Sequence, residues 1–340
     1  MCKNPIHSEP LLMGVKLFFN NKVVEAVIVA VSLGIILICI YTPDVILLKH
    51  IAHYTVHFML LFLFLGLFFL MLDNKRLLLW NFAFASLLSL FLKSSSNTNL
   101  QLAKDSGFPE VKVALINLSN ISQDPGIIPK YLNKANIDII AFNELTPNWD
   151  PYLKEQLLKS YPYMSNYLSI DNFGKAIYSK LPISQSDTLY HDGIPYLMSY
   201  IELGSDQKLV LLNAYFLPPL TRRQIAILNS QLGFLIQEIR QNKFPLICLG
   251  DFNLAPWSNE LRAFKYSAKL NDSRRDIIPR AKQDLTSFLD VPVEHITFNN
   301  RLSCTVFENI YDAQDNYIGI MGQYQLTNSK EEDLSILLHD

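Results

Sequence analysis

The stretch PLICLGDFNLAPWS, residues 245–258, is an apolar run that ends abruptly in Gly-Asp-Phe-Asn and continues into Pro-Trp-Ser. Its Leu, Ile and Cys residues predict a buried strand over 245–253. Asp251 and Asn253 end that strand, and their oxygen atoms are of the kind that hold a divalent cation and a phosphate together. An Asx turn is the alternative for such a pair on its own, so the function depends on partners elsewhere in the chain.

The chain around this strand alternates strand and helix patterns. Strands are predicted at 111–118, 137–145, 174–183, 196–203, 208–216, 293–300 and 317–326, and helices at 127–135, 149–160, 221–241 and 259–269. Thr221 is the predicted N-terminal cap of the helix at 221–241. Strands interleaved with helices predict a layered α/β domain, which covers residues 108–340.

Three apolar segments precede this domain and raise the mean hydropathy of the chain to +0.16. They cover Val23–Tyr41, Tyr54–Leu72 and Leu77–Leu92. A membrane-spanning helix needs about 20 apolar residues, so the first two qualify and the third is marginal. A buried helical hairpin is the alternative, but runs of this length with so few charges are rare in soluble domains. We expect a membrane domain at 1–92 with about three transmembrane helices, followed by a polar linker at 93–107.

Basic residues near the spans predict the orientation in the membrane. Five lie on one side of the predicted spans and two on the other: Lys3, Lys16, Lys22, Lys75 and Arg76 against Lys49 and Lys93. The N-terminus is therefore expected in the cytoplasm. Three crossings of the cell (inner) membrane would place the C-terminal domain outside the cytoplasm, whereas two crossings would reverse this.

The charge and the cysteine content of the chain argue against some classes of protein. Residues 1–100 hold 7 of the 29 basic and 4 of the 31 acidic residues, which leaves 22 basic and 27 acidic residues beyond them. A domain with this acidic excess is not expected to have a strong general DNA-binding surface. The four cysteines show neither a disulfide framework nor a zinc spacing.

Polar residues end two further predicted strands. Asn117 ends the strand at 111–118, and Glu144 ends the strongly apolar strand at 137–145. A turn residue is the local alternative for Asn117, and a helix cap for Glu144. If these strand ends meet Asp251 and Asn253 at one edge of a sheet, the four residues can bind a divalent cation and a phosphate.

At these residues the chain resembles the endonuclease/exonuclease/phosphatase superfamily, which has the DNase I-like fold. The resemblance covers roughly 110–328 and runs through VKVALINLSN, IDIIAFNELTPNW, GKAIYSKLPI, LLNAYFLPP, ICLGDFNLAPWS and QDNYIGIMGQYQL. It is most similar to a bacterial membrane-anchored subgroup with N-terminal spans and a GD-x-N-x-x-PWS stretch. It implies an α/β fold of two packed mixed β-sheets flanked by helices, a four-layer sandwich, with Mg²⁺ or Mn²⁺ at the sheet edge. The implied reaction is hydrolysis of phosphoester bonds in nucleic acids, lipid headgroups or small molecules.

The resemblance also implies roles for individual residues. Asn117 and Glu144 match residues that bind the metal ion. Asp251 and Asn253 match the pair that handles the attacking water and the scissile phosphate. Tyr215 lies where related proteins carry a Tyr or a His, and a Tyr there can donate to the phosphate or the leaving oxygen.

The last motif departs from the family pattern of Ser-Asp-His before the final strand. The preferred register puts Asp315 at the metal-binding Asp, Asn316 at the His, and Glu294 at the carboxylate that orients this His. A later register at 322–324 would leave too short a strand beyond it. His295 follows Glu294 and should face the opposite side of the strand, where a packed or surface His is at least as good an explanation as a catalytic one.

An Asn in place of the catalytic His changes the expected chemistry, because an amide cannot take a proton near neutral pH. Loss of one general acid–base group costs about 10²–10⁴ in rate. The sequence therefore supports two hypotheses. The first is a membrane-anchored, divalent-metal-dependent phosphoesterase with an altered, slow site. The second is a catalytically impaired relative that binds a phosphorylated ligand or a protein at the cell envelope.

Overall fold

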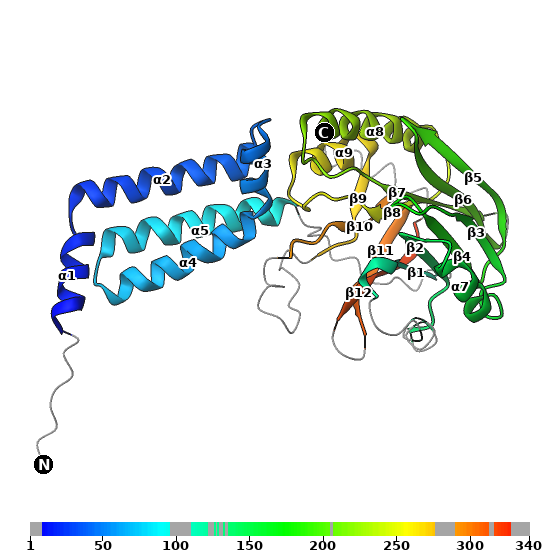
Figure 1. Cartoon of the computed structure of the whole chain (residues 1–340), viewed down its shortest axis with the longest axis horizontal. Helices are drawn as coiled ribbons and strands as arrows, with labels where there is room; N and C mark the ends of the chain where they lie inside the picture. Colours follow the sequence, from blue (N-terminus) through cyan, green and yellow to red (C-terminus); the bar gives the residue numbers. More distant parts are fainter. Residues whose placement is uncertain are drawn as a thin grey trace, which may run out of the picture. The chain divides into compact units, whose positions relative to one another are not determined.

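The computed structural model describes residues 9–95, 110–121, 126, 128, 132, 135–204, 207–275, 290–312 and 316–327. The chain forms two compact units, Met1–Ser95 and Ser96–Asp340 (Figure 1). Most of the predicted linker at 93–107, most of the helix predicted at 127–135, and Asp315 lie outside the described residues.

The first unit is helical. Its helices are α1 (Glu9–Phe19), α2 (Lys22–Tyr41), α3 (Ile46–His53), α4 (Thr55–Met71) and α5 (Lys75–Ser95). The Asn21 side chain accepts a hydrogen bond of 2.9 Å from the Val23 N–H and caps α2. Ile36 of α2, Phe62 of α4 and Leu88 of α5 lie in one buried apolar cluster, so these three helices pack together.

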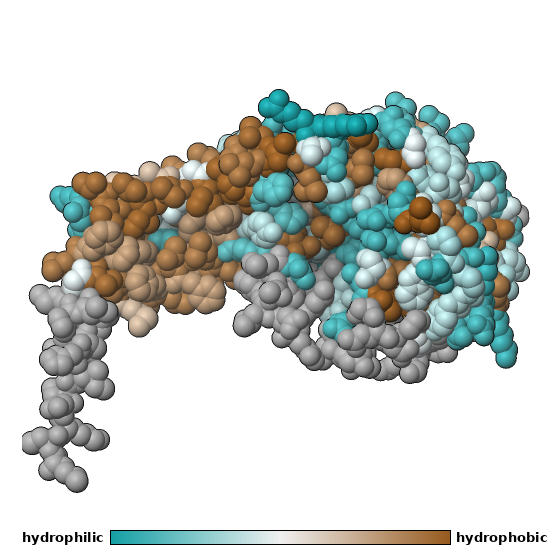
Figure 2. All heavy atoms as spheres, viewed as in Figure 1, coloured by the Kyte–Doolittle hydropathy of each residue, from teal (hydrophilic) through white to brown (hydrophobic). Residues whose placement is uncertain are grey.

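The outside of this unit is also apolar (Figure 2). Val23, Val31 and Phe64 are 70%, 59% and 63% exposed, an arrangement that water disfavours and lipid favours. Helices α2 and α5 are long and apolar enough to cross a membrane. The pair α3 and α4, bent by 61°, is a third candidate if the two helices form one span.

The second unit contains two six-stranded sheets. The first has the spatial order β11 (Leu302–Tyr311), β12 (Tyr317–Leu326), β1 (Glu110–Asn117), β2 (Ile139–Asn143), β4 (Lys175–Ser179), β3 (Tyr163–Tyr167). The second has the order β5 (Ile183–His191), β6 (Ile194–Gly204), β7 (Gln207–Tyr215), β8 (Leu246–Asp251), β10 (Glu294–Asn299), β9 (Leu270–Asp272). Each sheet is mixed, because β1–β2 and β7–β8 are parallel and the remaining pairs are antiparallel.

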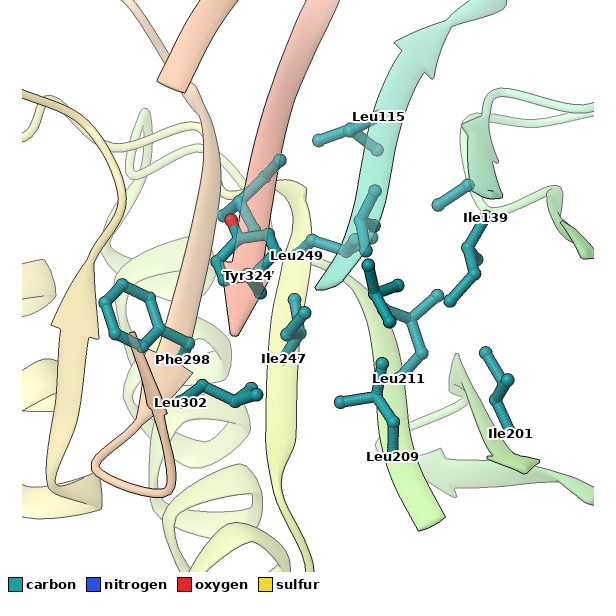
Figure 3. Packing of buried hydrophobic residues seen from close by; sticks show 14 of the residues in the cluster. Leu115, Ile139, Ile201, Leu209, Leu211, Ile247, Leu249, Phe298, Leu302 and Tyr324 are labelled. Atoms are coloured by element: carbon teal, nitrogen blue, oxygen red, sulfur yellow. The ribbon is translucent and has the colours of Figure 1, made fainter. Parts of the chain in front are cut away.

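Apolar side chains fill three layers. The inner faces of the two sheets form one cluster that includes Leu115, Ile139, Leu211 and Leu249 (Figure 3). Helix α7 (Trp149–Leu157) covers the outer face of the first sheet, and α8 (Arg222–Gln241) and α9 (Asn259–Ala268) cover that of the second. The structure therefore has the predicted two packed mixed sheets flanked by helices.

The helix boundaries follow from local caps. The Thr221 hydroxyl accepts a hydrogen bond of 3.2 Å from the Gln224 N–H, so the predicted cap of α8 is confirmed. Ser258 caps α9 in the same way, through the Leu261 N–H at 3.3 Å. The strand predicted at 174–183 is divided between β4 and the start of β5, and β3, β9 and β11 are strands that the sequence pattern did not predict.

Candidate active site

The inner-face side chains of both sheets change from apolar to polar toward the same end of the strands. Alternate residues of a strand share a face, so the polar positions are those that continue the buried series, as Asn117 continues Val113 and Leu115. They form a first polar row of Asn117, Asn143 and Lys175 on β1, β2 and β4, and a second polar row of Tyr215, Asp251 and Glu294 on β7, β8 and β10. Within each row the residues are direct partners in the strand register, and all six are buried.

Contacts at or next to the two rows cross between the sheets. The Lys175 ammonium lies 5.9 Å from the centroid of the Tyr215 ring. The Asn120 amide, just beyond β1, donates to the Glu294 carboxylate at 3.3 Å. Residues far apart in the chain thus meet in one cluster, which contains the predicted Asn117, Tyr215, Asp251 and Glu294.

Two more predicted residues, Glu144 and Asn253, follow the ends of β2 and β8. Both have left-handed backbone, with φ of +58° and +51°. Such a conformation costs a residue other than Gly roughly 1–2 kcal/mol, and strain of this kind is concentrated at functional sites. The Glu144 carboxylate accepts a hydrogen bond of 3.1 Å from the Asn117 amide. The structure therefore brings these two predicted metal ligands into contact.

Asp251 has its position fixed by backbone geometry on either side. Gly250 has φ of +148°, and a Cβ there would overlap the Ala214 carbonyl oxygen of β7. On the other side, the Asn253 N–H donates to Asp251 Oδ1 at 3.0 Å, and the Asn253 amide donates to the Phe216 carbonyl oxygen at 3.0 Å. These contacts hold Asp251 and Asn253 next to the end of β7, where Tyr215 lies.

Tyr215 is suited to donate a hydrogen bond. Burial raises the pKa of its phenol, and the negative charges of Asp251 and Glu144 raise it further, against the lowering effect of hydrogen bonds with Asn172 and Asn253. The hydroxyl therefore stays protonated at neutral pH. A protonated phenol beside two carboxylates can donate to a phosphate oxygen.

The partner of Glu294 differs from the one expected. The Tyr317 hydroxyl donates to the Glu294 carboxylate at 3.2 Å, and both side chains are buried. Asn316 is exposed, and its backbone N–H and side-chain amide donate to Asp312 at 2.8 and 2.9 Å. Glu294 thus pairs with Tyr317, the first inward-facing residue of β12, and its expected role in orienting the residue at position 316 stays a prediction. A catalytic role of Asn316 stays a prediction.

His295 faces away from the two rows, as its place next to Glu294 predicts. Its Nε2 donates to the Leu254 carbonyl oxygen at 2.8 Å, and its ring stacks on Phe252 with centroids 5.4 Å apart. Burial lowers the pKa of this imidazole to about 4. A neutral, packed histidine on the outer face of the sheet is a structural residue of the core.

Asn143, Lys175 and Asn213 are inward-facing polar residues that were not predicted from the sequence. Neither polar atom of the Asn143 side chain has a hydrogen-bond partner, nor does the Asn213 oxygen, although the Asn213 amide donates to the Phe142 carbonyl oxygen at 3.1 Å. Lys175 donates to the Phe173 carbonyl oxygen at 3.0 Å, and burial lowers its pKa to about 7. Strand alternation, counted from the apolar inner-face residues, is the signal that would have found all three.

The donors at this site suit a hard cation. Among the described residues no group of three or more His, Cys, Asp or Glu side chains is placed to hold a metal ion, so a zinc site of His and Cys is not indicated there. Mg²⁺ commonly binds through one or two carboxylates and keeps several waters, which fits Glu144 together with the amide oxygen of Asn117. The buried Asn143 amide without a protein partner also indicates a polar occupant of this region.

A family model described as the Endonuclease/Exonuclease/phosphatase family matches residues 115–312, more than half of the chain. The chain belongs to this family. Members of this superfamily are metal-dependent phosphoesterases and nucleases, and the matched segment contains Asn117, Glu144, Asp251 and Glu294. No curated protein is significantly similar to the chain in sequence.

Solved structures share the fold of the second unit. A humanized D. rerio TDP2 with 14 mutations is 18% identical with a TM-score of 0.51, covering 64% of this chain and 99% of its own. The endonuclease/exonuclease/phosphatase from Beutenbergia cavernae DSM 12333 is 12% identical with a TM-score of 0.53, covering 65% and 72%. That from Bacteroides vulgatus is 12% identical with a TM-score of 0.53, covering 64% and 100%. At these identities the similarity establishes the DNase I-like fold alone.

Proposed function

We propose that this chain is a divalent-metal-dependent phosphoesterase. The observation that carries the proposal is the pair of buried polar rows at one end of the two sheets, in a chain of this family. Buried polar residues are costly unless they are paired or bind a ligand. Here they include two carboxylates and a lysine, with strained backbone at Glu144 and Asn253 beside them.

Each residue of the site has a separate role in the proposed reaction. Glu144 and Asn117, with Asp315, would hold Mg²⁺ or Mn²⁺, whose charge stabilises the negative charge that develops on phosphoryl oxygens. Asp251 orients a water and accepts its proton. Asn253 positions the phosphate through its amide, and Tyr215 donates a hydrogen bond to a phosphate or leaving oxygen.

Glu294 and Tyr317 make the site unusual. A phenol hydrogen-bonded to a carboxylate is a hydrogen-bond donor, but it does not exchange protons near neutral pH as an imidazole does. We therefore propose slow turnover, since a missing general acid–base group costs about 10²–10⁴ in rate.

We also propose that α2, α5 and the bent pair α3–α4 anchor the protein in the cell (inner) membrane, with the second unit outside the cytoplasm. The exposed apolar side chains of these helices and the five-to-two distribution of basic residues support this orientation. A reporter that is active only in the cytoplasm, fused after Ser95, should give no signal. A strong signal would reverse the orientation.

The test of the proposed activity uses the full chain in detergent. Bis(p-nitrophenyl) phosphate and p-nitrophenyl phosphate serve as a diester and a monoester, each with and without Mg²⁺ or Mn²⁺. We expect metal-dependent turnover that is lost in Glu144→Gln and kept in Glu308→Gln, a matched change at an exposed strand position. Absence of metal-dependent turnover toward both esters would refute an esterase and favour the catalytically impaired relative that binds a phosphorylated ligand or a protein.

The acidic excess beyond residue 100 does not favour general binding of DNA. Nucleic acid, lipid headgroups and small phosphorylated molecules all contain the phosphoester that this site would take.

A further inference from the structure

Lys175 is the one member of the two polar rows with a positive charge. It lies directly opposite Asn143 in the register of β2 and β4, where facing Cβ atoms are about 4.5–5.5 Å apart. Both side chains point toward the second sheet, because Ile177 and Ala141, two residues away on their strands, belong to the inner core. Lys175 and Asn143 are thus neighbours on the inner face.

The ammonium of Lys175 is buried with few partners. The residue is 1% exposed, and among the described residues its polar contacts are the Phe173 carbonyl oxygen at 3.0 Å and the ring of Tyr215 at 5.9 Å. No ion pair joins it to a described carboxylate. An ammonium has three donors, so two find no acceptor in these contacts.

Asn143 repeats this situation with a neutral group. It is 1% exposed, and neither its side-chain oxygen nor its nitrogen has a partner. Natural proteins rarely leave buried polar atoms unpaired, and an unpaired buried charge is costlier still. Two such groups, side by side and facing one cluster, indicate that both are completed by a ligand.

The positive charge of Lys175 indicates that the ligand is an anion. Burial lowers the pKa of Lys175 to about 7, whereas the negative charges of Asp171 and Asp251 act in the opposite direction. An anion in contact with the ammonium would favour its charged form and raise this pKa. Lysine is a common phosphate-binding residue, and its ammonium acts on the phosphate as a point charge.

We propose that Lys175 and Asn143 form an anion subsite within the cluster and bind an oxygen of the phosphoryl group. The Lys175 ammonium and the Asn143 amide N–H would both donate to that oxygen, beside Tyr215 and Asp251. The identity of the anion as a substrate phosphate rests on the proposed function, but binding of inorganic phosphate does not.

The experiment follows the thermal midpoint of the full chain in detergent against the concentration of inorganic phosphate, with EDTA present and the ionic strength held constant with chloride. We expect a saturable rise in the midpoint of the wild-type chain. Lys175→Met should lower the apparent affinity for phosphate at least tenfold. Lys180→Met, a change just beyond the other end of β4, should leave it unchanged.

The unliganded midpoint separates this role from a structural one. Replacing a buried charge by an apolar side chain of similar length is often neutral or stabilising, so the unliganded Lys175→Met chain should unfold at the wild-type temperature or above it. A markedly lower midpoint with unchanged phosphate affinity would show a structural lysine and overturn the proposal. Lys175→Gln provides the same comparison if the Met variant does not fold.

The absence of a phosphate effect on the wild-type chain would also overturn the subsite, as would a phosphate effect of the same size in the wild-type chain and both Lys175 variants. Failure of the proposed function gives a different result, because it appears as absent metal-dependent turnover whatever phosphate does. Phosphate binding that follows Lys175 without turnover would support the subsite in a protein that is not an esterase.

Discussion

Replacing Glu144 with Gln should remove the stabilisation of the second unit by Mg²⁺ or Mn²⁺. Glutamine keeps the length of the side chain and an oxygen that can accept a hydrogen bond from the Asn117 amide, which lies 3.1 Å from the Glu144 carboxylate in the wild-type chain. It loses the negative charge that a hard cation requires. The substitution therefore tests metal binding with little change to the packing around β2.

The size of the effect follows from mass action. An ion that binds only the folded state stabilises it by RT ln(1 + [L]/Kd), about 2.7 kcal/mol at a hundredfold excess over Kd. The second unit comprises residues Ser96–Asp340. In a domain of this size each kcal/mol moves the midpoint by roughly 2–4 °C, which predicts a shift of about 5–10 °C.

Tryptophan fluorescence is a suitable probe of unfolding, because Trp257 is 1% exposed in this unit. The full chain in detergent is heated with and without the ion, and Glu308→Gln serves as the matched control. We expect the shift in the wild-type and Glu308→Gln chains and not in Glu144→Gln. The reasoning fails if Glu144→Gln retains the full shift, because the ion then binds elsewhere, or if the wild-type chain shows none.

Three further predictions concern the same unit. Burial lowers the pKa of His295 to about 4 from an unfolded value of 6.5, so the free energy of unfolding should be highest above pH 6.5 and decrease by about 3 kcal/mol as the pH falls to 4. Urea unfolding at several pH values should show a weaker pH dependence in His295→Gln. Tyr317→His should raise the diesterase turnover by up to about 10²–10⁴-fold, because it places an imidazole beside Glu294. A higher turnover in Asn316→His than in Tyr317→His would contradict this prediction, since Asn316 contacts Asp312. Gly250→Ala should lower the free energy of unfolding by about 3 kcal/mol or more, since φ of +148° and the Ala214 carbonyl oxygen exclude a Cβ, and unchanged urea unfolding would refute this.

The central strands could be predicted from the sequence because they are buried on both faces. Strands such as β2 and β8 form continuous apolar runs, which signal a strand without any knowledge of its neighbours. The edge strand β5 is largely exposed along Ser184–Asp187, so hydropathy gives no such signal there. Its place depends on pairing with β6, which only the folded chain contains.

The site was predictable where a polar residue ends an apolar run. Glu144 and Asp251 stand out for this reason. Lys175 instead begins its strand, so only the alternation counted back from Ile177 marks it as inward-facing. The contact of Glu294 with Tyr317 was missed because it joins β10 of the second sheet to β12 of the first, and a sequence pattern does not show which side chains meet between sheets.

The place of β12 in the first sheet has a consequence for the order of folding. This strand is the last of the described chain, yet it lies between β11 and β1 and pairs with β1 from Glu110↔Gln325 to Ile116↔Gly319. During synthesis one edge of β1 therefore stays unpaired until more than two hundred further residues have been made, and loop closure over such a separation is slow. Tyr317 and Glu294 meet only after this closure. A chain that ends before β12 would keep an exposed strand edge prone to aggregation and would lack part of its site.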